Sequence, residues 1–324
     1  MNEHEQIYHL QKKVLDHIEL TREEALTLCS VTDVDTLSEA ANDIRETLCG
    51  NDFDMCGVLS IKNGRCSENC RFCPQSSIAV SEIHSFSLLD GDIIVREGAK
   101  RAEQGVRHYC LVSNGRKIRN EDLTPLCESI RRLITETDLK VCVSLGLLDA
   151  DQLKRLKETG VSRIHNNLET SRQRFASLCT THSYDEKLTV VQNAHAAGLE
   201  VCCGGILGVD ESWEDRVDLA LQIRRLRAES VPINLLNAYP GTPLEHQKPV
   251  PYDDVRKTIA LFRFLVPTAY IRLAAGRPQL HDTGLSCFRS GANAAITGDM
   301  LNVSGITVES DLQAIRKMGY QMDR

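Results

Sequence analysis

Three closely spaced cysteines are the residues in this sequence whose types and spacing could do chemistry. Cys66, Cys70 and Cys73 lie in the segment KNGRCSENCRFCPQS, a C-x3-C-x2-C arrangement. The same intervals would also suit the buried stripe of a helix. Four of the five intervening side chains are polar, however (Ser67, Glu68, Asn69 and Arg71), with Gly64 before them and Pro74 after them. These neighbours favour a loop whose three thiolates converge on one point.

Three thiolates without a fourth protein ligand favour an iron–sulfur cluster over zinc. A closed zinc site needs four ligands, and no CxxC or HxxxH pair elsewhere in the sequence completes one. On a [4Fe–4S] cluster, three thiolates leave one iron open to the amine and carboxylate of S-adenosylmethionine (SAM). Electron transfer then cleaves SAM to a 5′-deoxyadenosyl radical, while the protein orients the cofactor and excludes solvent. The triplet therefore predicts radical chemistry at this loop.

The elements that must hold this loop form an alternating pattern from about residue 55 onward. We expect strands at 56–63, 107–113, 139–146, 162–169, 199–208, 232–238, 269–276 and 294–298. Amphipathic stretches such as 120–137 and 183–198 separate these strands, and Gly160 and Gly198 stand where helix C-caps belong. The repeats favour an α/β fold, a (β/α)8 TIM-type barrel, with a doubly wound open sheet as the alternative. The cysteine loop follows the first strand, at the edge where barrel active sites are assembled.

The chain divides into three expected parts without any low-complexity linker. Residues 1–50 have helical spacing, with Thr21 as an N-cap followed by acidic residues, and predict a helical N-terminal segment. We expect the barrel to occupy residues 51–300. Residues 301–324 are expected to form a C-terminal tail that packs on the barrel.

Composition narrows the class of protein. The net charge of −7 over 324 residues argues against a general nucleic-acid binder. The polar start and the absence of a long apolar run predict a cytoplasmic protein that does not enter a membrane. Thirteen cysteines, an odd count, argue against a disulfide scaffold. We interpret Cys29, Cys49 and Cys127 as small buried apolar residues.

Several segments carry a resemblance to a known family. These are CSENCRFCPQS, HNNLETS (165–171), EVCCGGILG (200–208), VPINLLNAYPGTPLE (231–245), YIRLAAGR (270–277) and CFRSGANAAITGD (287–299). In this order they resemble the biotin synthase family, whose barrel is of the radical SAM kind, over about residues 50–320. Phe72 matches the aromatic position usual in radical SAM proteins. HNNLETS, SENC and GDML…SGI resemble the branch of the family that is frequent among anaerobes.

The resemblance implies that dethiobiotin is converted to biotin with sulfur from an auxiliary iron–sulfur cluster. It implies that the ligands of this cluster are Cys110, Cys142, Cys202 and Arg272, each within a predicted strand. An ordinary salt bridge is the alternative for Arg272. Cys56 stands where the commoner branch has a serine, so it is an extra thiolate or a replacement for Arg272. The cluster is accordingly [2Fe–2S] or a four-iron cluster.

Three other cysteines remain to be placed. Cys203 follows Cys202 directly, and strand alternation is expected to point it at the surrounding helices. Cys179 and Cys287 are weaker candidates for the auxiliary cluster.

The predicted strand at 162–169 has a polar face. His165, Asn167 and Glu169 alternate with their neighbours and therefore share one side, which would be wasteful inside a barrel unless they bind something. The resemblance implies that Asn167 and Glu169 contact the SAM ribose and the adjacent substrate. It also implies that Asn234 hydrogen-bonds the ureido ring of dethiobiotin, which an amide complements with a donor and an acceptor. A turn residue at a strand end is the alternative for Asn234.

The expected partners follow from the same chemistry. The substrates are dethiobiotin and SAM, a flavodoxin-type or ferredoxin-type reductant supplies the electron, and the resemblance implies a homodimer. Two alternatives remain open. One is another barrel-type radical SAM enzyme, such as a hydrogenase-cofactor maturase or a methyltransferase-like relative. The other is a non-catalytic metal-binding or redox-sensing protein.

Overall fold

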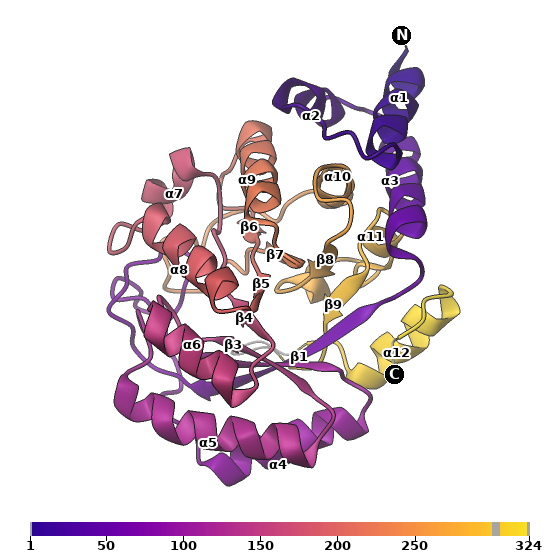
Figure 1. The fold of residues 1–324 in the computed structure, drawn as a ribbon. Helices are drawn as coiled ribbons and strands as arrows, with labels where there is room; N and C mark the ends of the chain where they lie inside the picture. Colours follow the sequence, from indigo (N-terminus) through magenta and orange to yellow (C-terminus); the bar gives the residue numbers. More distant parts are fainter. Residues whose placement is uncertain (1, 300–304, 323–324) are drawn as a thin grey trace.

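The computed structural model describes residues 2–299 and 305–322, and its centre is a closed parallel barrel (Figure 1). Within the described residues the strands are β1 (Asp54–Lys62), β2 (His108–Ser113), β3 (Lys140–Ser144), β4 (Arg163–His165), β5 (Glu200–Cys202), β6 (Gly205–Leu207), β7 (Ser230–Leu235), β8 (Tyr270–Leu273) and β9 (Ala294–Ile296). They follow the order β5-β4-β3-β2-β1-β9-β8-β7-β6, and a pairing between β5 and β7 closes the ring. The predicted (β/α)8 barrel is confirmed, and the open sheet is excluded by this closure.

One stave of the barrel differs from the prediction because it is broken in the middle. The stretch 199–208 was expected to be one strand, but it forms β5 and β6, which both pair with β7. The break lies at Gly204, where a Cβ atom would stand 1.9 Å from the carbonyl oxygen of Pro232. Only glycine allows this close approach of two backbones.

The neighbouring strand is shorter than predicted for a related reason. β4 ends at His165 rather than at Glu169, and the amides of Leu168 and Glu169 both donate to the Gly204 carbonyl. Glu169 has φ 69°, a conformation outside the strand region. The polar residues after His165 are therefore held by an irregular turn and not by strand alternation.

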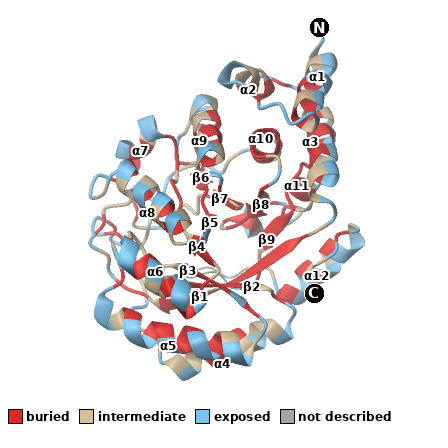
Figure 2. Ribbon diagram, viewed as in Figure 1, coloured by how far each residue is buried: buried red, intermediate tan, exposed pale blue. Residues whose placement is uncertain are grey.

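Helices cover the outside of the barrel (Figure 1). They are α4 (Gly91–Glu103), α5 (Asn120–Glu136), α6 (Ala150–Thr159), α7 (Arg172–Leu178), α8 (Tyr184–Ala196), α9 (Trp213–Leu226), α10 (Tyr252–Leu265) and α11 (Leu285–Phe288). Gly160 caps α6 in the left-handed conformation, as predicted. Buried residues face the strands and exposed ones face solvent (Figure 2), so the core lies between the helices and the sheet.

The N-terminal residues form α1 (Glu3–Leu15), α2 (Arg22–Cys29) and α3 (Val34–Cys49) before the barrel begins. Thr21 caps α2 through a reciprocal pair of hydrogen bonds with Glu24, as the sequence predicted. α3 packs on α1 and α10, and α2 packs on α9. This segment is thus part of the helical layer outside the strands.

The C-terminal segment contains α12 (Val308–Lys317), which lies against the barrel. Asp311 on α12 accepts two hydrogen bonds from the buried Arg277 guanidinium, at 2.6 and 3.0 Å. Farther on, Gln321 pairs with Asp52, just before β1. Residues 300–304 and 323–324, which include part of the GDML…SGI segment, lie outside the described residues. Among the described residues, no helix has the length and apolar character needed to cross a membrane.

Candidate active site

The cysteine triplet lies in the long connection between β1 and α4, at the carboxyl ends of the strands. The loop is held by its own backbone and by Arg65, whose guanidinium donates to the carbonyls of Ala79 and Ser81 at 2.7 and 2.9 Å. The amide of Cys66 donates to the Gln75 carbonyl at 2.8 Å and so ties the two ends of the triplet together. The loop is therefore shaped by contacts that do not use the thiols.

All three thiols face one cavity of about 250 Å³. Burial raises the pKa of Cys73 to about 11, which marks a site where a thiolate needs a positive partner. The amide of Glu68 donates to Cys66 Sγ at 3.4 Å. A cavity lined by three thiols and open to solvent on one side fits a [4Fe–4S] cluster with one iron free for a small ligand.

A second cavity of about 290 Å³ adjoins the first and suits SAM and a small substrate. His165, Asn167 and Glu169 line both cavities, so the prediction that they share one face holds, although the strand predicted to align them ends at His165. Glu169 Oε2 is buried and has no hydrogen-bond partner, while its Oε1 lies 3.9 Å from Lys187 Nζ. An unpartnered buried carboxylate oxygen fits a diol such as a ribose.

Two asparagines of this cavity are already anchored to the backbone. Asn167 Oδ1 accepts from the Gly204 amide at 3.0 Å. Asn234 donates to the Gly205 carbonyl at 3.0 Å and accepts from the Ala275 amide at 3.2 Å. Because an amide has two donor hydrogens and two acceptor lone pairs, Asn234 keeps one of each for a ligand. The backbone contacts fix its orientation.

Four thiols meet deeper in the barrel. Cys56, Cys110, Cys142 and Cys202, from β1, β2, β3 and β5, line a cavity of about 180 Å³ together with Arg163, His165 and Arg272. In the sheet register, Cys110 is paired with Cys142 on β3 and with Val58 on β1. Val58 lies two residues after Cys56, so the two share one face of β1. Thiols that converge from four strands of the barrel fit a second iron–sulfur cluster.

The anionic partner of Arg272 is a residue that sequence reasoning missed. Arg272 Nη2 lies 2.5 Å from Asp54 Oδ2, and Arg163 Nη1 lies 3.2 Å from the same oxygen. Burial opposes the charge of Arg272, but Asp54 together with the sulfurs of Cys56 and Cys202 outweighs burial and raises the arginine pKa. The salt bridge considered as the alternative for Arg272 is therefore present.

The remaining hydrogens of Arg272 are mostly used as well. Nε donates to Ser230 Oγ, and Nη1 donates to the carbonyls of Asp54 and Ala295. Four of the five guanidinium hydrogens thus have protein partners, since Asp54 takes one from Nη2. The guanidinium is thus held mainly by Asp54 and by acceptors on the neighbouring strands.

His165 contacts the deepest thiol. Burial alone would raise the pKa of Cys202, but the hydrogen bond and charge of His165 together with the charges of Arg272 and Arg163 lower it. Burial would lower the pKa of His165, and the contact with Cys202 raises it instead. His165 therefore joins all three cavities, because it lines each of them.

Cys179, Cys287 and Cys203 all lie outside the deep cavity that the four thiols line. Cys179 lies 3.7 Å from Cys70, beside the cysteine loop, and is therefore not a candidate for the deep cluster. Cys287 packs in the hydrophobic core on α11, so it is excluded for the same purpose. Cys203 is buried in the core behind the strands, as alternation predicted.

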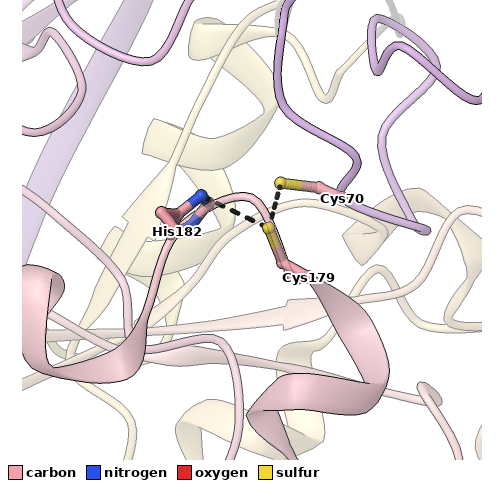
Figure 3. Close-up of side chains that lie close together, drawn as sticks. All are labelled: Cys70, Cys179 and His182. Atoms are coloured by element: carbon pink, nitrogen blue, oxygen red, sulfur yellow. Dashed lines mark hydrogen bonds between the residues drawn. The ribbon is translucent and has the colours of Figure 1, made fainter.

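A group beside the loop was missed by sequence reasoning. Cys70, Cys179 and His182 have their ligand-type atoms within 4.8 Å of one another (Figure 3). Glu68 Oε2 accepts from His182 Nδ1 at 2.6 Å. The signal that could have found the pair is the C-x-x-H spacing of Cys179 and His182.

Comparisons with known proteins agree with this geometry. The Radical SAM superfamily model matches residues 60–223, and the Biotin and Thiamin Synthesis associated domain matches residues 232–321. The chain is 43% identical to Biotin synthase of Brachyspira hyodysenteriae, covering 97% of this chain and 94% of that one. It is 45% identical to Biotin synthase of Clostridium botulinum strain Loch Maree, covering 96% and 98%.

Solved structures share the fold. Methylornithine synthase superposes with a TM-score of 0.85 at 21% identity, covering 97% of both chains. A maturase of the [FeFe]-hydrogenase superposes with a TM-score of 0.81 at 19% identity, covering 98% of this chain and 75% of that one. At such identities the likeness concerns the barrel alone.

Proposed function

The chain belongs to the biotin synthase family within the radical SAM superfamily, and we propose that it converts dethiobiotin to biotin. One observation carries the proposal. Two separate sets of thiols lie at the mouth and in the depth of one barrel, and His165 lines both of their cavities and the SAM-sized cavity beside them. This arrangement suits a substrate held between a radical source and a sulfur source.

We propose that Cys66, Cys70 and Cys73 hold a [4Fe–4S] cluster at the mouth of the barrel. When bound, this cluster and SAM supply hydrogen-abstracting radical chemistry, and the deep cluster supplies sulfur. The chain itself positions the reactants and keeps water away. Phe72, which lines both outer cavities, covers the boundary between them with an apolar ring.

The SAM and substrate contacts are assigned to three side chains. The free oxygen of Glu169 accepts from the ribose hydroxyls, and Asn167 keeps its amide hydrogens for the same ligand. Asn234 offers the ureido ring of dethiobiotin one donor and one acceptor. Its backbone anchors hold it rigid, so little side-chain entropy is lost when the substrate binds.

For the auxiliary cluster we propose four thiolate ligands, from Cys56, Cys110, Cys142 and Cys202. Arg272 then acts as a buried positive charge beside the cluster and not as a ligand, because Asp54 and three other acceptors already occupy most of its hydrogens. Four thiolates can hold either a [2Fe–2S] or a four-iron cluster, and Mössbauer spectroscopy of the reconstituted protein distinguishes the two. Arg163 adds a second positive charge against the concentrated negative charge.

The partners proposed for the reaction follow from its electron demand. A flavodoxin-type or ferredoxin-type protein supplies low-potential electrons. The thirteen cysteines are all free, which supports a reducing, cytoplasmic location. The family resemblance supports a homodimer, which light scattering of the anaerobic protein would measure.

The decisive experiment is an anaerobic assay of reconstituted protein with SAM, reductant and dethiobiotin. We expect both biotin and 5′-deoxyadenosine. Cys66→Ala should abolish both products, whereas Cys110→Ala should spare SAM cleavage and prevent biotin formation. Equal loss of deoxyadenosine in both variants would contradict the two-site assignment. Deoxyadenosine without biotin from the unaltered protein would refute the proposed reaction and favour another radical SAM activity.

A further inference from the structure

Cys179 contacts the middle cysteine of the triplet, although 109 residues separate the two in sequence. Its Sγ lies 3.7 Å from Cys70 Sγ, and Figure 3 shows the two sulfurs pointing toward one another. The residue is buried and follows directly after α7. A second thiol therefore stands against one of the proposed cluster ligands.

The segment that carries Cys179 is hydrogen-bonded to the cysteine loop on both sides of Cys70. Asn69 Oδ1 accepts from the amides of Thr180 and Thr181 at 2.9 and 3.2 Å. The amide of Arg71 donates to the Leu178 carbonyl at 2.9 Å. Since both neighbours of Cys70 are tied to residues 178–181, the distance between the two sulfurs is set by backbone contacts.

Cys179 stands outside the cavity that suits the cluster. The described side chains that line this cavity include Glu68, Cys70 and His182, but Cys179 is not among them. The sulfur of Cys179 thus contacts Cys70 Sγ without lining the space for iron. This position does not suit an additional ligand and does suit a hydrogen-bond donor.

The Cys179 sulfur has four polar neighbours: His182 Nδ1 at 3.3 Å, Asn69 Oδ1 and Thr181 Oγ1 at 3.4 Å, and Cys70 Sγ at 3.7 Å. Asn69 Oδ1 is already occupied by two amide hydrogens. Thr181 Oγ1 accepts from the Asn69 amide at 3.1 Å and donates to Glu68 Oε2 at 2.9 Å. His182 Nδ1 lies 2.6 Å from the same carboxylate oxygen and must carry a hydrogen to bond it, so it offers Cys179 no lone pair. Thr181 Oγ1 keeps one lone pair but is neutral, whereas Cys70 Sγ becomes an anionic acceptor when it binds iron as a thiolate, and hydrogen bonds to charged acceptors are the stronger ones.

In the cluster-free protein, Cys70 carries its own proton and can donate to Cys179. When Cys70 binds iron as a thiolate, that proton is gone and the direction of the contact must reverse. The contact then becomes a charge-assisted S–H···S hydrogen bond from Cys179 to a ligand sulfur.

We propose that Cys179 is a positioning residue of the radical-generating cluster, which donates a hydrogen bond to the Cys70 thiolate and thereby raises the reduction potential of the cluster. The inference rests on the proposed assignment of Cys66, Cys70 and Cys73 as ligands. Hydrogen bonds to ligand sulfurs withdraw negative charge from the cluster and favour its reduced form. Glu68 supports the donor indirectly, because its carboxylate accepts from His182 Nδ1 and so removes that ring nitrogen as an acceptor for Cys179.

The test compares three variants of the reconstituted protein: Cys179→Ala, Cys179→Ser and, as a matched control, Cys127→Ala. Cys127 is a buried core cysteine on α5, so its loss also removes a sulfur from a packed interior. Redox titration followed by electron paramagnetic resonance measures the potential of the SAM-binding cluster. We expect a more negative potential for Cys179→Ala, a smaller shift for Cys179→Ser because the hydroxyl keeps a donor, and no shift for Cys127→Ala.

A second readout protects the test against a folding defect. The iron–thiolate stretching frequencies in the resonance Raman spectrum should change in Cys179→Ala and stay unchanged in Cys127→Ala. An unchanged potential and spectrum in both Cys179 variants at full cluster content would overturn the proposal. Cys66→Ala, measured alongside, tests the underlying assignment separately: a cluster that keeps its SAM response in that variant would refute the ligand set itself.

Discussion

Replacing Asp54 by asparagine should destabilise the cluster-free protein more than any surface charge change. The Asp54 carboxylate is buried and bonds Arg272 at 2.5 Å, Arg163 at 3.2 Å and His108 at 2.6 Å. The asparagine side chain would keep the shape but leave the buried Arg272 guanidinium without its anion, while Arg163 would keep Glu200 as a partner at 2.8 Å. Removing one partner of a buried ion pair costs about 3–5 kcal/mol, and we expect the free energy of unfolding to fall by this amount.

The assay is urea unfolding of the cluster-free protein under anaerobic conditions, followed by far-ultraviolet circular dichroism. Asp218→Asn is the matched control, because Asp218 pairs with Arg22 while both side chains are partly exposed. Such a pair contributes about 0.2–1 kcal/mol. A loss of less than about 1 kcal/mol in Asp54→Asn, comparable with that control, would refute the charge-compensation argument.

The same variant also tests whether Arg272 faces an anionic cluster. A cluster held by thiolates in the adjacent cavity would supply negative charge in place of Asp54. The penalty of Asp54→Asn should therefore shrink after reconstitution of the auxiliary cluster. An equal penalty in cluster-free and reconstituted protein would contradict the placement of that cluster beside Arg272.

Three further predictions concern individual side chains. Cys56→Ser should lower the amount of iron bound per chain, whereas Arg272→Lys should leave it unchanged. Iron analysis and Mössbauer spectroscopy measure both variants, and an equal loss of iron in the two would make Arg272 a ligand. Glu169→Gln should weaken SAM binding roughly 10-fold to 100-fold, since a hydrogen bond to a charged group contributes about 1.5–3 kcal/mol. Calorimetry with SAM measures the affinity, and an unchanged affinity would contradict the ribose contact. His108 should contribute stability to the cluster-free protein that is lost as the pH drops from about 7.5 to about 5.5, because burial lowers its pKa below the usual value of about 6.5 and the unfolded chain takes up a proton that the folded chain resists; the raised pKa values of His165 and His182 act in the opposite direction. In His108→Gln this pH dependence should be weaker, and an unchanged slope in urea titrations would show that other groups cause it.

The strand residues that line the barrel could be predicted, but the groups around them could not. Alternation along 107–113 and 139–146 places Cys110 and Cys142 on the inner face of their strands, because successive strand residues point to opposite sides. The partner of Arg272 was missed since Asp54 begins β1, 218 residues earlier. A local pattern carries no information about which distant carboxylate a barrel strand will face.

The polar stretch after His165 illustrates a different limit. Its side chains were expected to share one face, and they do line the same two cavities. The predicted cause was wrong, because Asn167 and Glu169 are held by a turn that bonds the backbone at Gly204. The residue types indicated a ligand site, while the path of the backbone depended on Gly204, between β5 and β6.

The sequence by itself determined the cysteine triplet, since residues four and three positions apart in a loop lie close together in any fold. It also determined the α/β class and favoured a barrel, because eight alternating strand and helix patterns leave few ways to bury their apolar faces, while closure of the sheet was decided by the tertiary structure. Only the tertiary structure decided that four thiols from separate strands share one cavity, that Asp54 neutralises Arg272 and that Cys179 contacts Cys70. These contacts join residues far apart in the chain, and closure of the barrel brings them together.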